Sequence, residues 1–192
     1  ASNQSGRYPN RAAQDQKLIC YTSPPFEQDI QLCGHPVIHL AVASSESDVA
    51  FYVYLEVVTP GGQVTYLTEG LLRGIHHKVS NQPSPYKLQV PYHSFRQDDG
   101  ESLIPGKPAE VEFGLLPVSA LIRRDQRIRV AIAGHDEGNF PRHPHEGNTV
   151  YTFYRSNQLA CWIDLPIQLT PLNSHNPVHS GSATTRMKKS PR

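Results

Sequence analysis

One stretch of the chain, residues 49–74, constrains the fold more than any other: VAFYVYLEVVTPGGQVTYLTEGLLRG. Apolar residues occupy every second position from Val49 to Val57, and a period of two places them on one face of a β-strand. The letters TPGG that follow supply one fixed φ angle and two glycines that tolerate positive φ, which suits a hairpin turn. The alternation then resumes over residues 63–68. We therefore predict a strand, a tight turn and a second strand.

Short alternating segments separated by turn residues continue through the rest of the chain. Besides the hairpin we expect strands at residues 17–22, 29–33, 36–43, 71–78, 109–115, 127–133, 149–154 and 158–165. The last two should pair as a hairpin around Ser156-Asn157. We expect a short edge strand at most over Tyr86–Val90 and one weak helical turn over Leu116–Arg123. Many short strands without a helix of three turns indicate an all-β chain, a β-sandwich, and long crossing loops favour a jelly roll.

Three divisions of the chain follow from this pattern. Residues 1–16 are predicted to be an extended or disordered lead, residues 17–169 the jelly-roll domain, and residues 170–192 a disordered basic tail. The tail contains no acidic residue and four of its last seven residues are basic, and a solvated tail is the expected state.

Composition excludes several partners. A formal net charge of +1 gives no reason to expect nucleic acid, and no apolar run is long enough to cross a membrane. The polar residues at the N-terminus lack the apolar core of a signal peptide, so we expect a cytoplasmic location. Cys20, Cys33 and Cys161 are expected to be buried free thiols, with a Cys20–Cys33 disulfide as the alternative.

The sequence contains no motif for catalysis. A serine nucleophile of an α/β-hydrolase needs Gly-x-Ser-x-Gly, and the two glycine pairs at that spacing enclose Leu72 and Asp136 instead. Glycine-rich phosphate loops and HExxH zinc helices are also absent from the sequence. We predict no catalytic residue in this chain and no cofactor.

The ten histidines raise the question of a metal site. His76 and His77 are adjacent, so on a strand they would point to opposite faces. The loop over residues 135–145 holds the best ligand cluster, but no ligand spacing is matched and plain loop polarity is the expectation. Calcium is the other alternative, with ligands from Asp48, Asp98, Asp99, Asp136 and Glu137, against which stands their ordinary role in turns. We predict no metal.

Three aromatic residues are the candidates for an interface or a ligand site. Tyr52 and Tyr54 share the strand face opposite the apolar stripe, so an exposed face would present an aromatic platform for a sugar or another domain. Packing within the sheet or under a loop is the equal alternative. Trp162, the only tryptophan, is expected to anchor a core or an interface.

Four segments together resemble the C-terminal domain of the cocaine esterase and X-Pro dipeptidyl-peptidase (CocE/NonD) family of serine hydrolases. The first is LICYTSPPFEQDIQLCGHPVIHLAVASSESDVAFYVYLEVVTPGGQVTYLTEGLLRG. The others are PYHSF, PGKPAEVEFGLLPVSALIRRDQRIRVAIAG and NFPRHP, in the same order as in the family. The resemblance spans residues 18–165. The chain departs from it at Asp125-Gln126, where the family often has Gly-His, which affects the local turn only.

The resemblance implies a galactose-binding-like jelly roll that follows an α/β-hydrolase domain. In the family the catalytic Ser, Asp and His lie in that preceding domain, and none maps onto this sequence. The expected function is that of an accessory domain that packs on an ester- or amide-hydrolysing domain, helps wall its substrate pocket and supports a homo-oligomer, with the Tyr52/Tyr54 face as the contact. A free-standing carbohydrate- or ligand-binding module is the alternative. Catalysis through the loop over residues 135–145 is a third, less favoured one, because it lacks a nucleophile paired with a base.

Overall fold

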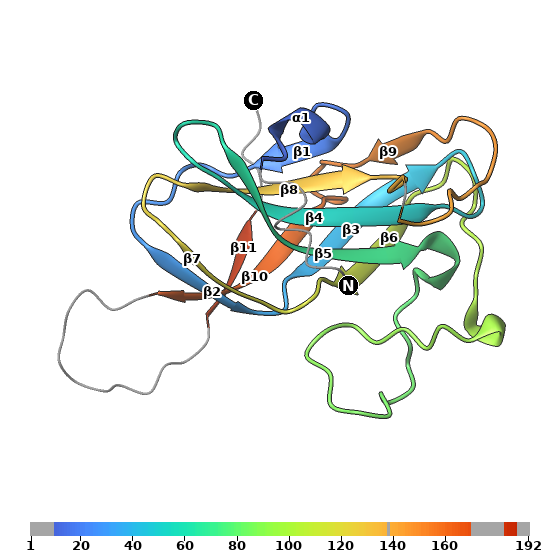
Figure 1. Ribbon diagram of the computed structural model, residues 1–192. Coiled ribbons are helices and arrows are strands. Elements are labelled where there is room, and N and C mark those ends of the chain that lie inside the picture. The colour runs from blue at the N-terminus through green and yellow to red at the C-terminus, as the bar shows by residue number, and fades with distance from the viewer. Residues whose placement is uncertain (1–9, 138, 170–182, 188–192) are drawn as a thin grey trace.

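The computed structural model describes residues 10–137, 139–169 and 183–187 and arranges them in two antiparallel β-sheets (Figure 1). The first sheet has four strands in the order β1-β8-β4-β5. Their bounds are β1 Ile19–Thr22, β8 Arg127–Ala133, β4 Ala50–Val58 and β5 Val64–Arg73. The central strand β4 pairs with β8 on one side and with β5 on the other. The pair β4–β5 is the predicted hairpin, which is confirmed.

The second sheet is built from interrupted strands. Its elements are β2 Ile30–Gly34, β3 Val37–Ser44, β6 Ala109–Gly114, β7 Val118–Ile122, β9 Tyr151–Phe153, β10 Trp162–Leu169 and β11 Ala183–Met187. Because β10 pairs with both β2 and β3, these two strands form a single row that is broken between them. The break follows Gly34, whose φ of +134° suits a residue without a Cβ atom. In the same sheet β6 pairs with β3 and β7 pairs with β2, and these two strands form a neighbouring row that is broken at the same level. There Leu115 N donates a hydrogen bond of 2.8 Å to Pro36 O.

The strand β4 is buried along its whole length, on both faces. On one face Phe51, Val53 and Leu55 join the main core, which fills the space between the two sheets. On the other face Tyr52 and Tyr54 belong to a second, smaller cluster. This outer face of the first sheet must therefore be covered by something other than the second sheet.

The N-terminal segment provides part of that cover. It forms the short helix α1, Ala12–Asp15, which lies beside β1 in Figure 1. Its backbone is tied to the start of β5, because Arg11 N donates to Val64 O over 3.0 Å and Val64 N donates to Asn10 Oδ1 over 3.1 Å. Leu18 then packs against the smaller cluster.

The prediction of an all-β sandwich is confirmed, while jelly-roll connectivity stays a prediction. The helical turn predicted for Leu116–Arg123 is wrong, because these residues contain strand β7, which pairs with β2. Within it Ile122 is buried while Leu121 is exposed, an alternation with the strand period of two. The short apolar strand was hidden by the proline before it and the two arginines after it.

The predicted hairpin around Ser156-Asn157 is also wrong. Both β9 and β10 run antiparallel to β3 and pair with successive parts of it, so they lie end to end and not side by side. The bridge between Arg155 and Ala160, with hydrogen bonds between Ser156 and Leu159, closes the short turn between them. The segment Tyr86–Val90 forms no strand, and the strand predicted over residues 71–78 ends at Arg73, where the 3-10 helix Gly74–His76 begins.

The two terminal segments differ in part from the extended or disordered chain expected there. Residues 12–15 of the lead form α1, and Ala183–Met187 of the tail form β11, which pairs with β10. The rest of the tail, apart from these five residues, and residues 1–9 lie outside the described residues. The division into lead, domain and tail stays a prediction. Among the helices that the structure describes, none has the length and apolar character needed to cross a membrane.

Candidate functional site

The two tyrosines predicted to form a platform are covered. Tyr52 is 5% exposed and Tyr54 6% exposed. The Tyr52 ring packs against Phe140, with ring centroids 5.5 Å apart, and the Arg11 guanidinium lies 4.3 Å from the centroid of the Tyr54 ring. Packing under a loop, the alternative to an exposed platform, is therefore what the structure contains.

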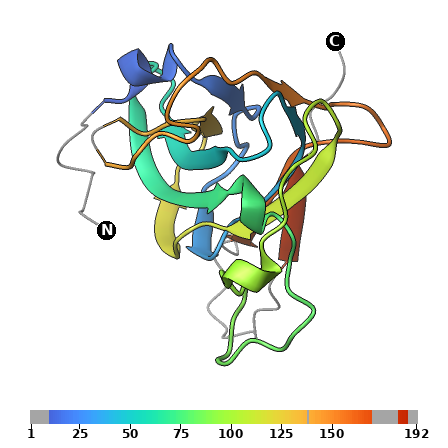
Figure 2. The same cartoon turned by 90° about the vertical axis from the view of Figure 1, so that its right-hand side faces the viewer.

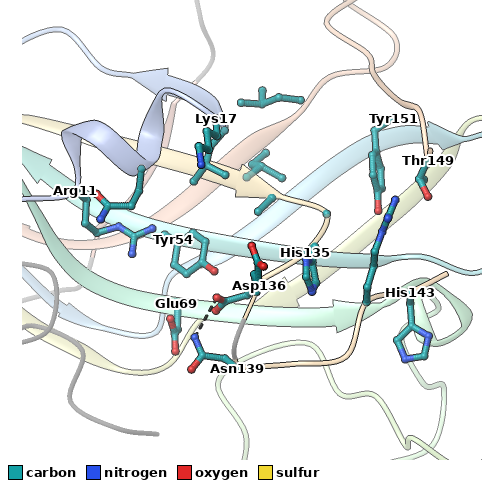
Figure 3. A pocket seen from close by; sticks show the side chains of 18 of the residues that line it. Arg11, Lys17, Tyr54, Glu69, His135, Asp136, Asn139, His143, Thr149 and Tyr151 are labelled. Atoms are coloured by element: carbon teal, nitrogen blue, oxygen red, sulfur yellow. Dashed lines mark hydrogen bonds between the residues drawn. The ribbon is translucent and has the colours of Figure 1, made fainter. Parts of the chain in front are cut away.

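A hollow opens between the two segments that cover these tyrosines. It has a volume of about 1060 Å³ and lies over the outer face of the first sheet, between the N-terminal segment and the loop after β8 (Figure 3). Figure 3 shows Tyr54 and Glu69 on the sheet, Arg11 and Lys17 on one side, and His135 and Asp136 on the other. Both charge signs therefore meet in this hollow.

Burial raises the pKa of several ionisable groups in the hollow. Burial, and then the charge of Asp136 and a hydrogen bond to it, raise the pKa of Tyr54. Burial and the Asp136 charge also raise the pKa of Glu69, while burial raises the pKa of Tyr151 to about 12. Asp136 Oδ1 accepts a hydrogen bond of 3.0 Å from Asn139 Nδ2. None of these phenols is thus ionised to act as a nucleophile near neutral pH.

The hollow lacks the pair of groups that nucleophilic catalysis requires. Neither serine nor cysteine lines it, and Thr149 provides its one aliphatic hydroxyl. Thr149 Oγ1 is buried and makes no hydrogen bond among the described residues, so no base is positioned to take its proton. A nucleophile needs a base within hydrogen-bonding reach. The arrangement can contact a ligand or another protein surface, but it does not supply acyl-transfer chemistry.

The histidine-rich loop does not assemble a metal site within the part of the chain that the structure describes. No group of three or more His, Cys, Asp or Glu side chains there is placed to hold a metal ion. The rings of His143 and His145 face each other with centroids 5.0 Å apart. Two of the carboxylates considered for calcium have protein partners, since Asp48 accepts from Arg73 and Asp99 accepts from Ser94.

Trp162, the third candidate, lies on the outer face of the second sheet and is half-buried. Its ring stacks on His39, with centroids 4.5 Å apart and an angle of 15° between the planes. His39 Nε2 lies 2.9 Å from Asp164 Oδ2, and its Nδ1 lies 3.5 Å from Glu112 Oε2. Trp162 is therefore an anchor of a local polar cluster, and a role in contacting a partner stays a prediction.

The three cysteines are free thiols, so the alternative of a Cys20–Cys33 disulfide is wrong. The expectation that all three are buried is also wrong, because Cys33 is exposed on β2. Burial, together with the Asp15 charge, raises the pKa of Cys20 to about 11. Burial also raises the pKa of Cys161, whose Sγ contacts the backbone of Ala41.

A chain of four charged residues beside the hollow, three of them buried and Arg129 partly buried, was not expected from the sequence. Arg11 Nε pairs with Glu56 Oε1, and Arg129 Nη1 donates to Asp15 Oδ2 over 2.7 Å. Glu56 is on β4 and Arg129 on β8, whereas the other two residues are in the N-terminal segment, so the chain clamps that segment onto the sheet. Burial and the Asp15 charge raise the pKa of Glu56 to about 7, although Arg11 opposes the shift.

Comparison with known proteins gives the family context of this architecture. The family model described as the X-Pro dipeptidyl-peptidase C-terminal non-catalytic domain matches residues 2–183. A Mycobacterium bovis protein named as a serine esterase is 47% identical over 160 residues, which cover 83% of this chain and 25% of the relative. The chain thus spans about a quarter of the length of the curated relatives that it matches.

Two solved structures support the fold. An aminopeptidase from the marine sediment archaeon Thaumarchaeota archaeon superposes with a TM-score of 0.67 at 17% identity, over 83% of this chain and 27% of that one. A CocE/NonD family hydrolase from Staphylococcus aureus superposes with a TM-score of 0.63 at 18% identity, over 82% of this chain and 32% of that one. In both cases the shared sandwich accounts for a minor part of a longer protein.

Proposed function

Because the chain belongs to the family of X-Pro dipeptidyl-peptidase C-terminal non-catalytic domains, we propose that it works by packing on an α/β-hydrolase domain of the same polypeptide. In this role it supports the wall of the hydrolase's substrate pocket and contributes no reacting group. The observation that carries the proposal is the hollow of Figure 3, which lacks a nucleophile paired with a base among the described residues. The reacting groups must then come from the remainder of the polypeptide.

The substrate class of that polypeptide belongs to the proposal as well. The relatives and neighbours are named as an esterase, an aminopeptidase and a hydrolase. The first name states a serine esterase, the second a peptidase, and the third a hydrolase. We therefore propose an ester or amide, including an X-Pro dipeptide, as the substrate. A cytoplasmic location and a homo-oligomer also remain proposals.

The free-standing carbohydrate-binding alternative is not favoured. Sugar recognition by stacking needs an exposed aromatic face. Tyr52 and Tyr54, the residues predicted to form that face, are covered by Phe140 and Arg11.

The test compares the hydrolase with and without this domain. Displacement of a catalytic group by about 1 Å can reduce the rate about 100-fold, so we expect kcat/KM to fall at least about tenfold when the domain is removed. Adding this chain back as a separate protein should restore part of the loss. A hydrolase that keeps its full kcat/KM, thermal stability and oligomeric state without the domain would refute the proposed role.

A further inference from the structure

Six of the ten large apolar side chains that are exposed among the described residues lie in loops at one end of the sandwich. We define this loop end as residues 45–49, 74–108, 134–137 and 139–150, which belong to the loops that join β3 to β4, β5 to β6 and β8 to β9. Figure 2 looks onto it. The six side chains are Val79, Tyr86, Phe95, Ile104, Phe140 and Val150. The loops at the opposite end, residues 23–29, 59–63 and 123–126, contain none of the ten.

The longest loop of this end is anchored at three points. Leu103 is buried in the main core. The two ring nitrogens of His93 lie 3.0 Å from Lys78 O and 2.8 Å from Glu112 O, which ties the loop to β6. Val90 packs directly on Gly114, where a Cβ atom would come within 2.5 Å of it. Exposed apolar side chains on an anchored loop present a fixed surface, which costs little entropy when a partner binds.

The long loop and the loop after β8 are both joined to the end of β3. Gly106 N donates to Ser44 O over 2.8 Å, next to the exposed Ile104. Ser45 N donates to Val150 O and Val150 N donates to Ser45 Oγ, each over 3.0 Å. The side chains of Ile104 and Val150 therefore project from segments that are fixed to the same turn.

Phe95 is held in an unfavourable backbone conformation. Its φ of +54° lies in the left-handed region, which is uncommon for a bulky residue. The ring touches His76 and His93, with centroid distances of 5.3 and 5.9 Å, yet the residue remains 62% exposed. The contacts with His76 and His93 therefore cover only part of the Phe95 ring.

Two ion pairs lie at the loop end. Arg73 pairs with Asp48, and Lys78 pairs with Glu101. The three loops hold eight acidic and five basic residues in all. The surface therefore combines exposed apolar side chains with a modest excess of acidic ones, and it fits an apolar partner surface that also carries basic side chains.

We propose that the loop end is the surface through which this domain docks on its hydrolase domain, with Phe95 as the central anchor. We take the partner to be the hydrolase domain because three quarters of the length of the curated relatives lies outside the region that this chain matches. Contacts between domains of one polypeptide commonly bury about 600–1,500 Å². The inference rests on the proposed function and replaces the Tyr52/Tyr54 face, which is buried, as the contact surface.

Hydrogen exchange separates the possible outcomes. It is measured by mass spectrometry on this chain alone and on the same chain joined to its hydrolase domain. We expect slower exchange in the joined protein at residues 74–108, above all around Phe95. Slower exchange at another face would overturn the loop end as the docking surface while leaving the proposed function intact. No difference anywhere in this domain would overturn both.

A substitution then separates docking from folding. Asn tolerates positive φ better than Phe, so Phe95→Asn should leave the stability of the isolated chain unchanged or raised. In the joined protein it should abolish the slower exchange of the loop end. Leu121→Thr removes an exposed apolar side chain from β7, away from the loop end, and should preserve that protection. Equal protection in the Phe95→Asn protein would contradict the role of Phe95.

Discussion

Replacing Glu56 by Gln should stabilise the protein at pH 8, although Glu56 is paired with an arginine. Glu56 is 0% exposed, and only its Oε1 is paired, with Arg11. Its Oε2 and Asp15 Oδ1 are buried without a hydrogen-bond partner among the described residues. Burial is the main cause that raises the pKa of Glu56 from 4.5 to about 7, followed by the Asp15 charge and by the hydrogen bond to Asp15 that a proton on Glu56 allows. An amide supplies such a donor at every pH.

The pKa fixes the direction and size of the effect. Because the folded-state pKa is raised, the favourable contribution of the protonated carboxyl is complete below about pH 4.5 and is lost as the pH rises through about 7. Each tenfold change in proton affinity is worth about 1.4 kcal/mol, so the loss reaches about 3 kcal/mol above pH 7. The Glu56→Gln protein should be more stable than the wild type by up to about 3 kcal/mol at pH 8, roughly 6–12 °C in Tm. At pH 5 the two should differ by much less.

The assay is urea unfolding followed by circular dichroism at pH 5 and pH 8. Histidines also titrate in this range, so the relevant quantity is the change with pH of the difference between variant and wild type. Glu110→Gln, at an exposed position on β6, is the matched control and should show no such change. If Glu56→Gln instead destabilises the protein by several kcal/mol at pH 8, then the pKa of Glu56 is not raised and its pair with Arg11 dominates, as removal of one partner of a buried ion pair would cause.

Two further predictions concern the cysteines and the long loop. Iodoacetamide at pH 8 should alkylate the exposed Cys33 before Cys20, because a pKa of about 11 leaves Cys20 with about 100-fold less thiolate than an ordinary thiol. Peptide mass spectrometry would show the order of labelling. Faster labelling of Cys20 would contradict the prediction. Gly114→Ala should cost about 1–3 kcal/mol in urea unfolding, because the added Cβ would meet Val90 at 2.5 Å. Gly61→Ala, whose added Cβ meets nothing closer than 3.9 Å, should change stability by no more than about 0.5 kcal/mol, and equal costs at both positions would refute the packing of Val90 on Gly114.

The fold was largely predictable because its signals are local. The alternation of Val49 to Val57 and the glycines after it determine a hairpin without reference to the rest of the chain. The pairing of segments is not local, which explains the failure at the last strands. Both β9 and β10 pair with β3, more than a hundred residues earlier, and no short-range pattern distinguishes this from a hairpin.

The surroundings of the candidate site were predictable only in part. The alternation correctly placed Tyr54 and Glu56 on the face opposite the main core, but it could not show what covers them. The cover comes from Arg11 and Phe140, in segments that have no periodicity. A glutamate on the face of a central strand within an otherwise apolar and aromatic run was the one signal that could have predicted a buried partner.

Hydrolysis of p-nitrophenyl acetate by the purified chain alone tests the central claim most directly. The chain belongs to a non-catalytic family, and its hollow lacks a nucleophile paired with a base among the described residues. We predict a rate equal to that of buffer, and no serine labelled by diisopropyl fluorophosphate. Saturable turnover that the same reagent abolishes would contradict the account.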